Sequence, residues 1–261
     1  MRLHRVKTVV EHTAYHIRYS MESLVDMFWF SITDVVIFGL ISLFFVQQTD
    51  SQTVVFILQG IIFWEVVRVG QYSVAIGAMW EIWSKSLSTL FVTPLTLNEF
   101  LAGQMISSLF KASIACLLTV VLAAVFFNYS IVQLGLMTFV YLGGFLLFAW
   151  AMGMFALALI IRYGTDIQSL SWSLIFLFQP IGTFFYPVET LPKVLQLVAR
   201  AFPPMYLNEA ARYQLFSASI NWNYIAIAYI SGAFYFILCY WFIHQMFKQA
   251  LENGRFSRME G

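Results

Sequence analysis

The chain has 261 residues, of which 61% are hydrophobic, 18% are aromatic and only 10% are charged, and its formal net charge is +1. A soluble domain is about one-quarter charged, so this chain has too few polar groups to cover a surface in water. Its apolar residues also fall in long runs, each near the ~20 residues that a bilayer-crossing helix needs. Composition therefore excludes an ordinary soluble enzyme, leaves no nucleic-acid partner to expect, and favours an all-α membrane protein.

Residues 1–20 predict an amphipathic helix that lies on the membrane surface. Apolar residues at helical spacing form a stripe between basic positions: Leu3, Val6, Val10, Ala14 and Ile17. Such a stripe buries its apolar side at the headgroup boundary and keeps its basic side in water.

Six membrane spans are expected after this helix, over residues 24–46, 53–76, 99–127, 131–161, 167–186 and 222–247. The third and fourth exceed the thickness of a bilayer, so they must tilt or project from it. Asn128, Tyr129 and Ser130 mark a tight turn between them. The whole chain is expected to form a single transmembrane domain.

Prolines interrupt the region around and after the fifth span: Pro180, Pro187, Pro192, Pro203 and Pro204. Proline removes an amide donor and clashes with the preceding helical turn, so a straight helix cannot continue here. The stretches between these prolines are too short to cross a bilayer. They predict a re-entrant or interfacial helical pair over residues 187–216. Within it, Glu209 and Arg212 have a spacing that lets them pair on one helix.

The basic residues predict the orientation. Nine fall on one predicted side of the membrane: Arg2, Arg5, Lys7, Arg18, Lys85, Arg162, Lys248, Arg255 and Arg258. Three fall on the other side: Lys193, Arg200 and Arg212. Because Lys and Arg accumulate in cytoplasmic loops, both termini are expected in the cytoplasm of a multi-pass protein of a bacterial inner membrane.

Charged residues also lie inside or at the edge of the apolar runs, where an ionised group is costly. These are Asp34, Glu65, Arg68 and Lys111. Glu65 and Arg68 are spaced to neutralise each other on one helix, and Asp34 and Lys111 could pair between helices. Structural ion pairs are one interpretation of these charges. An ion-coupling site of a stand-alone secondary transporter is the other.

No catalytic, cofactor-binding or metal site is expected. The sequence has no G-x-S-x-G elbow, no pair of histidines at metal-ligand spacing and no G-x-x-x-x-G-K-[ST] phosphate loop. Cys116 and Cys239 both lie in apolar runs, where a cysteine is usually a small buried hydrophobe. Any coupling to ATP must therefore come from a separate subunit.

Two stretches of the sequence are more specific than the hydropathy of a generic membrane protein. Residues 81–103, from Glu81 through Thr93-Pro94-Leu95 to Glu99 and Gly103, resemble the loop between the second and third spans of ABC-2 type permeases. Residues 185–212, with Phe185-Tyr-Pro-Val-Glu-Thr-Leu-Pro192 followed by later Pro and Glu-x-x-Arg elements, resemble the external re-entrant region of the same family. With the amphipathic start and six spans in the family's order, the resemblance covers essentially the whole chain.

The resemblance implies the permease subunit of an ABC exporter, with residues 77–95 as a cytoplasmic segment that contacts the ATPase. Its contact residues would be Glu81, Trp83, Lys85, Leu87, Leu90 and Pro94. The external region would contain Phe185, Pro187, Pro192, Pro203, Glu209 and Arg212. One departure is that Lys85 stands where many members have glycine, which indicates a subfamily with its own ATPase partner.

By the same resemblance, two copies or a pair of related permeases would form the pathway in the lipid bilayer, and ATP and Mg would bind the separate ATPase subunit. The aromatic residues of the first and fifth spans favour an amphiphilic substrate over a small ion. A lipid-linked glycan, a lipid and a hydrophobic drug stay open at this point. Two other functions are weighed: an ion-coupled secondary transporter and a membrane scaffold without transport.

Overall fold

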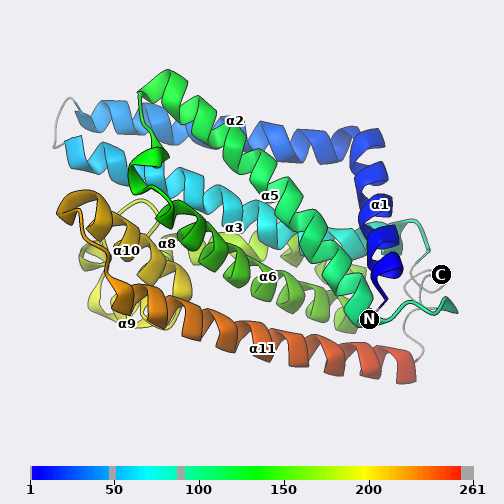
Figure 1. Cartoon of the computed structure of the whole chain (residues 1–261). Coiled ribbons are helices and arrows are strands. Elements are labelled where there is room, and N and C mark those ends of the chain that lie inside the picture. The colour runs from blue at the N-terminus through cyan, green and yellow to red at the C-terminus, as the bar shows by residue number, and fades with distance from the viewer. Residues whose placement is uncertain (1, 47–50, 87–91, 254–261) are drawn as a thin grey trace.

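The computed structural model describes residues 2–46, 51–86 and 92–253, and every regular element in these ranges is a helix (Figure 1). Four helices are long and apolar enough to cross a membrane: Val54–Trp83, Leu97–Phe127, Met137–Tyr163 and Trp222–Glu252. Phe28–Phe44 and Leu170–Ile181 are shorter apolar helical stretches. The predicted all-α class is confirmed.

Two helices form the centre of the molecule. In α3 (Ser51–Trp83) 83% of the most apolar window is buried, and in α6 (Met137–Tyr163) 78%, against 28% in α5 (Leu97–Phe127) and 22% in α11 (Trp222–Glu252). Glycines let the two central helices approach closely. Gly153 of α6 lies against Val74 and the carbonyl of Gln71, and Gly70 of α3 lies against Ala149.

The outer helices pack around this pair. α2 (Met21–Val46) and α5 pack on α3, and α11 runs along α6 (Figure 1). α1 (Leu3–Tyr19) leaves the line of α2 at Ser20, whose backbone is extended, and crosses one end of the bundle. The last turn of α11 lies at this same end, which we call the terminal end (Figure 1).

The second predicted span does not stop at residue 76. α3 continues without a break to Trp83, and residues 73–79 are all buried, as are Glu81 and Ile82. Ser73 and Glu81 are buried within this stretch, and Gly77 lies against the side chain of Gln104 on α5. Ser84 and Lys85, which follow the helix, are exposed.

The turn predicted at residues 128–130 is present. Asn128 caps α5 with a left-handed backbone (φ 51°), and its N–H donates to the carbonyl of Ala123. Asparagine tolerates this conformation better than most residues. A short 3₁₀ helix, η1 (Ile131–Leu134), then precedes α6, so α6 begins later than the predicted residue 131.

The fifth predicted span is interrupted and shorter than expected. It consists of η2 (Thr165–Ile167), α7 (Leu170–Ser173), η3 (Leu174–Leu177) and α8 (Phe178–Ile181). Helical structure ends directly after Pro180, and Thr183 turns the chain with a positive φ of 54°. The helical run predicted to residue 186 therefore stops at Ile181, because proline and this turn prevent its continuation.

The chain then forms η4 (Val188–Thr190), α9 (Lys193–Ala199) and α10 (Pro203–Ser217) before α11. Pro203 occupies the start of α10, where the missing N–H of proline costs nothing. α8, α9 and α10 gather at the end of the bundle opposite α1 (Figure 1). Two short helices thus follow the fifth apolar stretch, as the prolines predict.

Candidate functional site

Functional residues predicted from the sequence lie at three levels of the molecule: the terminal end, the opposite end and the interior between them. At the terminal end, Thr96 and Glu99 form a capping box at the start of α5. Glu99 also accepts a hydrogen bond from the backbone N–H of Arg2 (2.7 Å) and pairs with the guanidinium of Arg5 (3.4 Å). Arg5 further donates to the carbonyl of Pro94. These contacts, which we call the Glu99 clamp, hold the segment before α5 against the start of α1.

α1 is packed on protein along its length. Val6, Val9 and Thr13 are buried, and Val9 fills the space beside Gly103 of α5. His12 contacts the carboxylate of Glu81 (3.2 Å). Of the predicted stripe, Val6 is buried against protein, whereas Leu3 is 80% exposed.

In the described part of the chain, the predicted ATPase-contact residues lie at the end of α3 and in the segment before α5. Glu81 is buried and accepts a hydrogen bond from Ser86. Trp83 is half-exposed and its Nε1 donates to Gln168 (3.0 Å). Lys85 is exposed with a positive φ of 56°. The carbonyl of Pro94 is held by Arg5. Leu87 and Leu90 lie outside the described residues.

A groove of about 420 Å³ opens beside this region between α1 and the segment before α5. Its lining includes both predicted and unpredicted residues: His4, Thr8, His12, Glu81, Pro94 and Phe100. The sequence gives no sign of this groove, because its walls come from three elements far apart in the chain.

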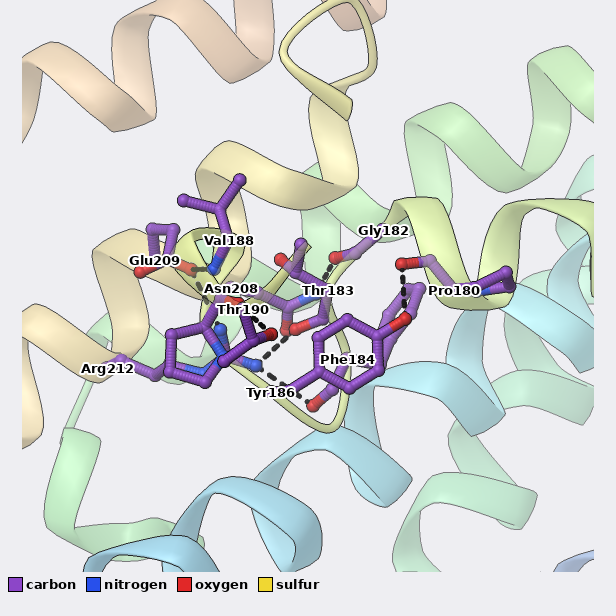
Figure 2. A network of polar contacts seen from close by, with 11 residues as sticks. Pro180, Gly182, Thr183, Phe184, Tyr186, Val188, Thr190, Asn208, Glu209 and Arg212 are labelled. Carbon is purple, nitrogen blue, oxygen red and sulfur yellow. Dashed lines mark hydrogen bonds and ion pairs between the residues drawn. The ribbon is translucent and has the colours of Figure 1, made fainter. Parts of the chain in front are cut away.

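At the opposite end, Arg212 is the centre of a buried polar network (Figure 2). Its Nη1 donates to Glu209 (2.9 Å), and its Nη2 donates to the carbonyls of Thr183 and Phe184. Glu209 in turn accepts from the N–H of Val188 (3.0 Å). Burial raises the pKa of Glu209, and the Arg212 charge opposes that shift. The predicted pairing of Glu209 with Arg212 is confirmed.

This network fixes the turn after α8. Asn208 donates to the carbonyl of Gly182 (2.7 Å), and the Tyr186 hydroxyl donates to that of Pro180 (2.8 Å) (Figure 2). Arg212 and Asn208 thus satisfy three carbonyls that the end of helix α8 and the following turn leave without helical partners. The ring of Phe185 stacks on that of Phe38 of α2, with the two ring centroids 4.2 Å apart. Pro187 and Pro192 precede η4 and α9 as their N-terminal flanking residues.

In the interior, Glu65 and Arg68 pair on α3 as their spacing predicts. Nε and Nη2 of Arg68 donate to Glu65, and the Ser31 hydroxyl of α2 donates to the same carboxylate. Asp34, on the same helix as Ser31, lies within electrostatic reach of both charges. The pair thus joins α2 to α3.

The predicted pair between Asp34 and Lys111 does not form. Lys111 lines a small cavity beneath α1 with His12, Trp80 and Glu81, near the terminal end. The two residues therefore face different neighbours, a difference that their positions in two apolar runs do not reveal.

A cavity of about 600 Å³ lies between α2, α3 and the α7–η3 stretch. Arg68 is the charged residue in its lining, and we call it the Arg68 cavity. The other lining residues are apolar or aromatic: Phe30, Tyr72, Ile76, Trp83, Trp172, Ile175 and Phe176. The lining residues of α3 are four positions apart, at 68, 72 and 76. In the sequence, this spacing cannot be told from that of residues that pack on a neighbouring helix.

The family model described as ABC-2 type transporter matches residues 16–216. The match begins within α1 and ends at the close of α10, so it includes the Arg68 cavity, the Arg212 network and Glu99, whereas Arg2 and Arg5 of the Glu99 clamp precede it. No curated protein sequence matches the chain.

Proposed function

Because this chain belongs to the ABC-2 type transporter family, whose members are membrane subunits of ABC transporters, we propose that it is the permease of an ATP-driven exporter. A separate ATPase subunit binds ATP and Mg and supplies the energy. The match over residues 16–216 carries this proposal, because it covers most of the chain.

The proposal includes six membrane spans. The four long apolar helices account for four of them, and the shorter stretches Phe28–Phe44 and Leu170–Ile181 lie within the first and fifth. α9 and α10 form the external re-entrant pair. The positions of α1 and the end of α11 at one end of the bundle support termini on the same side of the membrane. The excess of Lys and Arg on that side supports a cytoplasmic location in a bacterial inner membrane.

The ATPase contacts the terminal end, where the Glu99 clamp holds a short exposed segment in place. Val92 is 86% exposed, although it is apolar, and it is followed by Thr93 and Pro94. The ATPase can transmit its conformational change to the permease only through a rigid segment. Hydrogen bonds from α1 hold the segment that contains Pro94 in place. An exposed valine next to such a support is a suitable contact for a partner.

The transported molecule is an amphiphile, and two copies of the chain enclose its path. α2 and α5 expose many large apolar side chains, among them Trp29, Ile37, Phe44, Phe110 and Leu117. Such surfaces contact lipid or a second copy in a membrane.

The test is a complex purified with the ATPase encoded beside this chain. Val92→Asp is expected to lower the permease-dependent ATPase rate about tenfold or more, since a buried unpaired carboxylate costs several kcal/mol at an apolar contact. Val132→Asp, at an equally open valine (75% exposed) in η1, is the matched control and should leave the rate unchanged.

Equal ATPase rates in the two variants would contradict the contact. Transport driven by a proton or sodium gradient without ATP would favour the ion-coupled carrier instead. The interior carboxylate Glu65 gives that alternative little support, because Ser31 and Arg68 already occupy both of its oxygens.

A further inference from the structure

We propose that the Arg68 cavity binds the anionic head of the transported amphiphile, with the Arg68 guanidinium as its contact. This inference rests on the proposed function and narrows its substrate class to amphiphiles that carry a phosphate or carboxylate. The cavity has about 600 Å³, room for a head group and part of an attached chain or ring system.

The charge that faces the cavity is positive. Glu65 is fully buried, and both of its oxygens accept hydrogen bonds from Arg68, with Ser31 as a further donor. Arg68 lines the cavity, and its Nη1 makes no hydrogen bond to any described residue. A guanidinium carries five N–H donors, so this nitrogen keeps two for a ligand. A phosphate or carboxylate matches that geometry, whereas a cation would be repelled.

The walls suit the rest of an amphiphile. Five of the lining side chains are aromatic: Phe30, Tyr72, Trp83, Trp172 and Phe176. These aromatic rings can bury the acyl chain or ring system of the amphiphile, while the few polar groups of the cavity orient its head group. Phe30 also lies against the Arg68 guanidinium at 5.3 Å, which holds that side chain toward the cavity.

The position of Arg68 along α3 gives its contact with the anionic head group a role in transport. Arg68 lies near the middle of α3, and Trp83 closes the helix at the terminal end. At 1.5 Å per residue the two are about 22 Å apart along the helix. An anionic head that crosses an apolar layer has its highest energy near the middle. A guanidinium there lowers that barrier, and its bonds to Glu65 keep it from holding the head too tightly.

The experiment uses the chain in nanodiscs of phosphatidylcholine with three matched probes. ω-Bromoundecyl phosphate, ω-bromoundecyl maltoside and ω-bromoundecyltrimethylammonium share one chain, and their bromine quenches nearby tryptophan fluorescence. Trp83→Phe with Trp172→Phe identifies the share of quenching that comes from the cavity. The phosphate is expected to bind at least about tenfold more tightly than the ammonium, the effect of one charge-assisted hydrogen bond.

Glu65→Gln combined with Arg68→Gln removes both members of the ion pair together and leaves the Asp34 carboxyl of α2 in place. This double variant should weaken binding of the phosphate by about 10- to 100-fold and leave binding of the maltoside unchanged. Lys248→Gln, which removes an exposed positive charge on α11, is the control and should change neither. If the double variant fails to fold, Arg68→Lys tests the same contact, because it keeps the charge and loses the planar fork.

Tighter binding of the ammonium, or an equal loss for all three probes in the double variant, would overturn the inference. Nanodiscs with phosphatidylglycerol separate the sources of the head group: competition by this lipid identifies an ordinary membrane lipid. The binding assay needs no ATPase, so its failure is distinct from failure of the proposed function. That function fails separately if the purified complex binds the phosphate probe but shows no ATP-dependent movement of it.

Discussion

Arg212 joins two segments of the chain through a single buried side chain. It pairs with Glu209 on its own helix and reaches the carbonyls of Thr183 and Phe184, on the turn that follows α8. Only 4% of the residue is exposed, so water cannot replace these partners if the guanidinium is removed. The turn after Pro180 therefore depends on this residue for its shape.

Arg212→Met is expected to destabilise the protein by about 3–5 kcal/mol, because it leaves two carbonyls without a donor and the partly buried Glu209 carboxylate without its counter-charge. The midpoint of thermal unfolding of the purified protein in detergent measures the loss. Arg200→Met removes an exposed guanidinium from the same region and should cost less than about 0.5 kcal/mol. Similar losses in the two variants would show that the network contributes little.

The contacts of Arg212 also show what a sequence predicts at the scale of a residue. Its pairing with Glu209 follows from helical spacing, as does that of Arg68 with Glu65, since both lie within one turn. The carbonyls that Arg212 meets are 28 and 29 residues away, and nothing in their local sequence marks them. The Arg68 cavity escaped prediction for the same reason, because three elements contribute its walls.

Among the elements, α1 shows that periodicity can predict a helix without predicting which protein surface it packs on. The periodicity of residues 3–19 predicts the helix, but apolar residues lie on two overlapping stripes. The partner decides between them: Gly103 of α5 leaves space for Val9, and Glu99 accepts from Arg2 and Arg5. The sequence pattern of α1 does not reveal the space beside Gly103 on α5.

Gly103→Leu is expected to release α1 from α5, because the new side chain would occupy the space that Val9 fills. Trypsin should then cleave after Arg5 and Lys7 about tenfold faster in the folded protein, the change that ~1.4 kcal/mol of easier local opening produces. Limited proteolysis followed by mass spectrometry measures the rate.

Ser113→Leu places the same side chain on the exposed face of α5 and serves as the control. If Gly103→Leu leaves the cleavage rate at the level of Ser113→Leu, the packing of Val9 on α5 is not what holds α1.

For the whole molecule, the sequence predicts the order of helical segments well and their lengths less well. Hydropathy locates α5, α6 and α11, because each is a long apolar run. It places a boundary inside α3, where Ser73 and Glu81 are polar but buried, Glu81 in contact with His12 of α1. It also extends the fifth span past Ile181, since the apolar run continues beyond the point where Pro180 and Thr183 end the helix.

The orientation of the bundle can be measured with single cysteines. Cys116 and Cys239 are buried, so serine at both positions gives a background without native thiols. Lys7→Cys at the terminal end should react with a membrane-impermeant maleimide only in inverted membrane vesicles. Ser219→Cys, at an exposed position after α10, should react only in right-side-out vesicles. Labelling of both positions from one side would contradict the five spans proposed between them and the external position of the proposed re-entrant pair.

The continuity of α3 has a consequence for how the protein moves. Its 33 residues form a rod of about 50 Å, and its glycines are not free to act as joints, because Phe184, Ala149 and Gln104 occupy the space beside them. Such a rod tilts or slides as a whole. A displacement of α3 near Trp83 therefore also displaces Gly60 and the turn around Phe184. Two spin labels on α3 would keep their separation through a cycle of ATP hydrolysis, while the distance from either label to α2 would change with the volume of the Arg68 cavity.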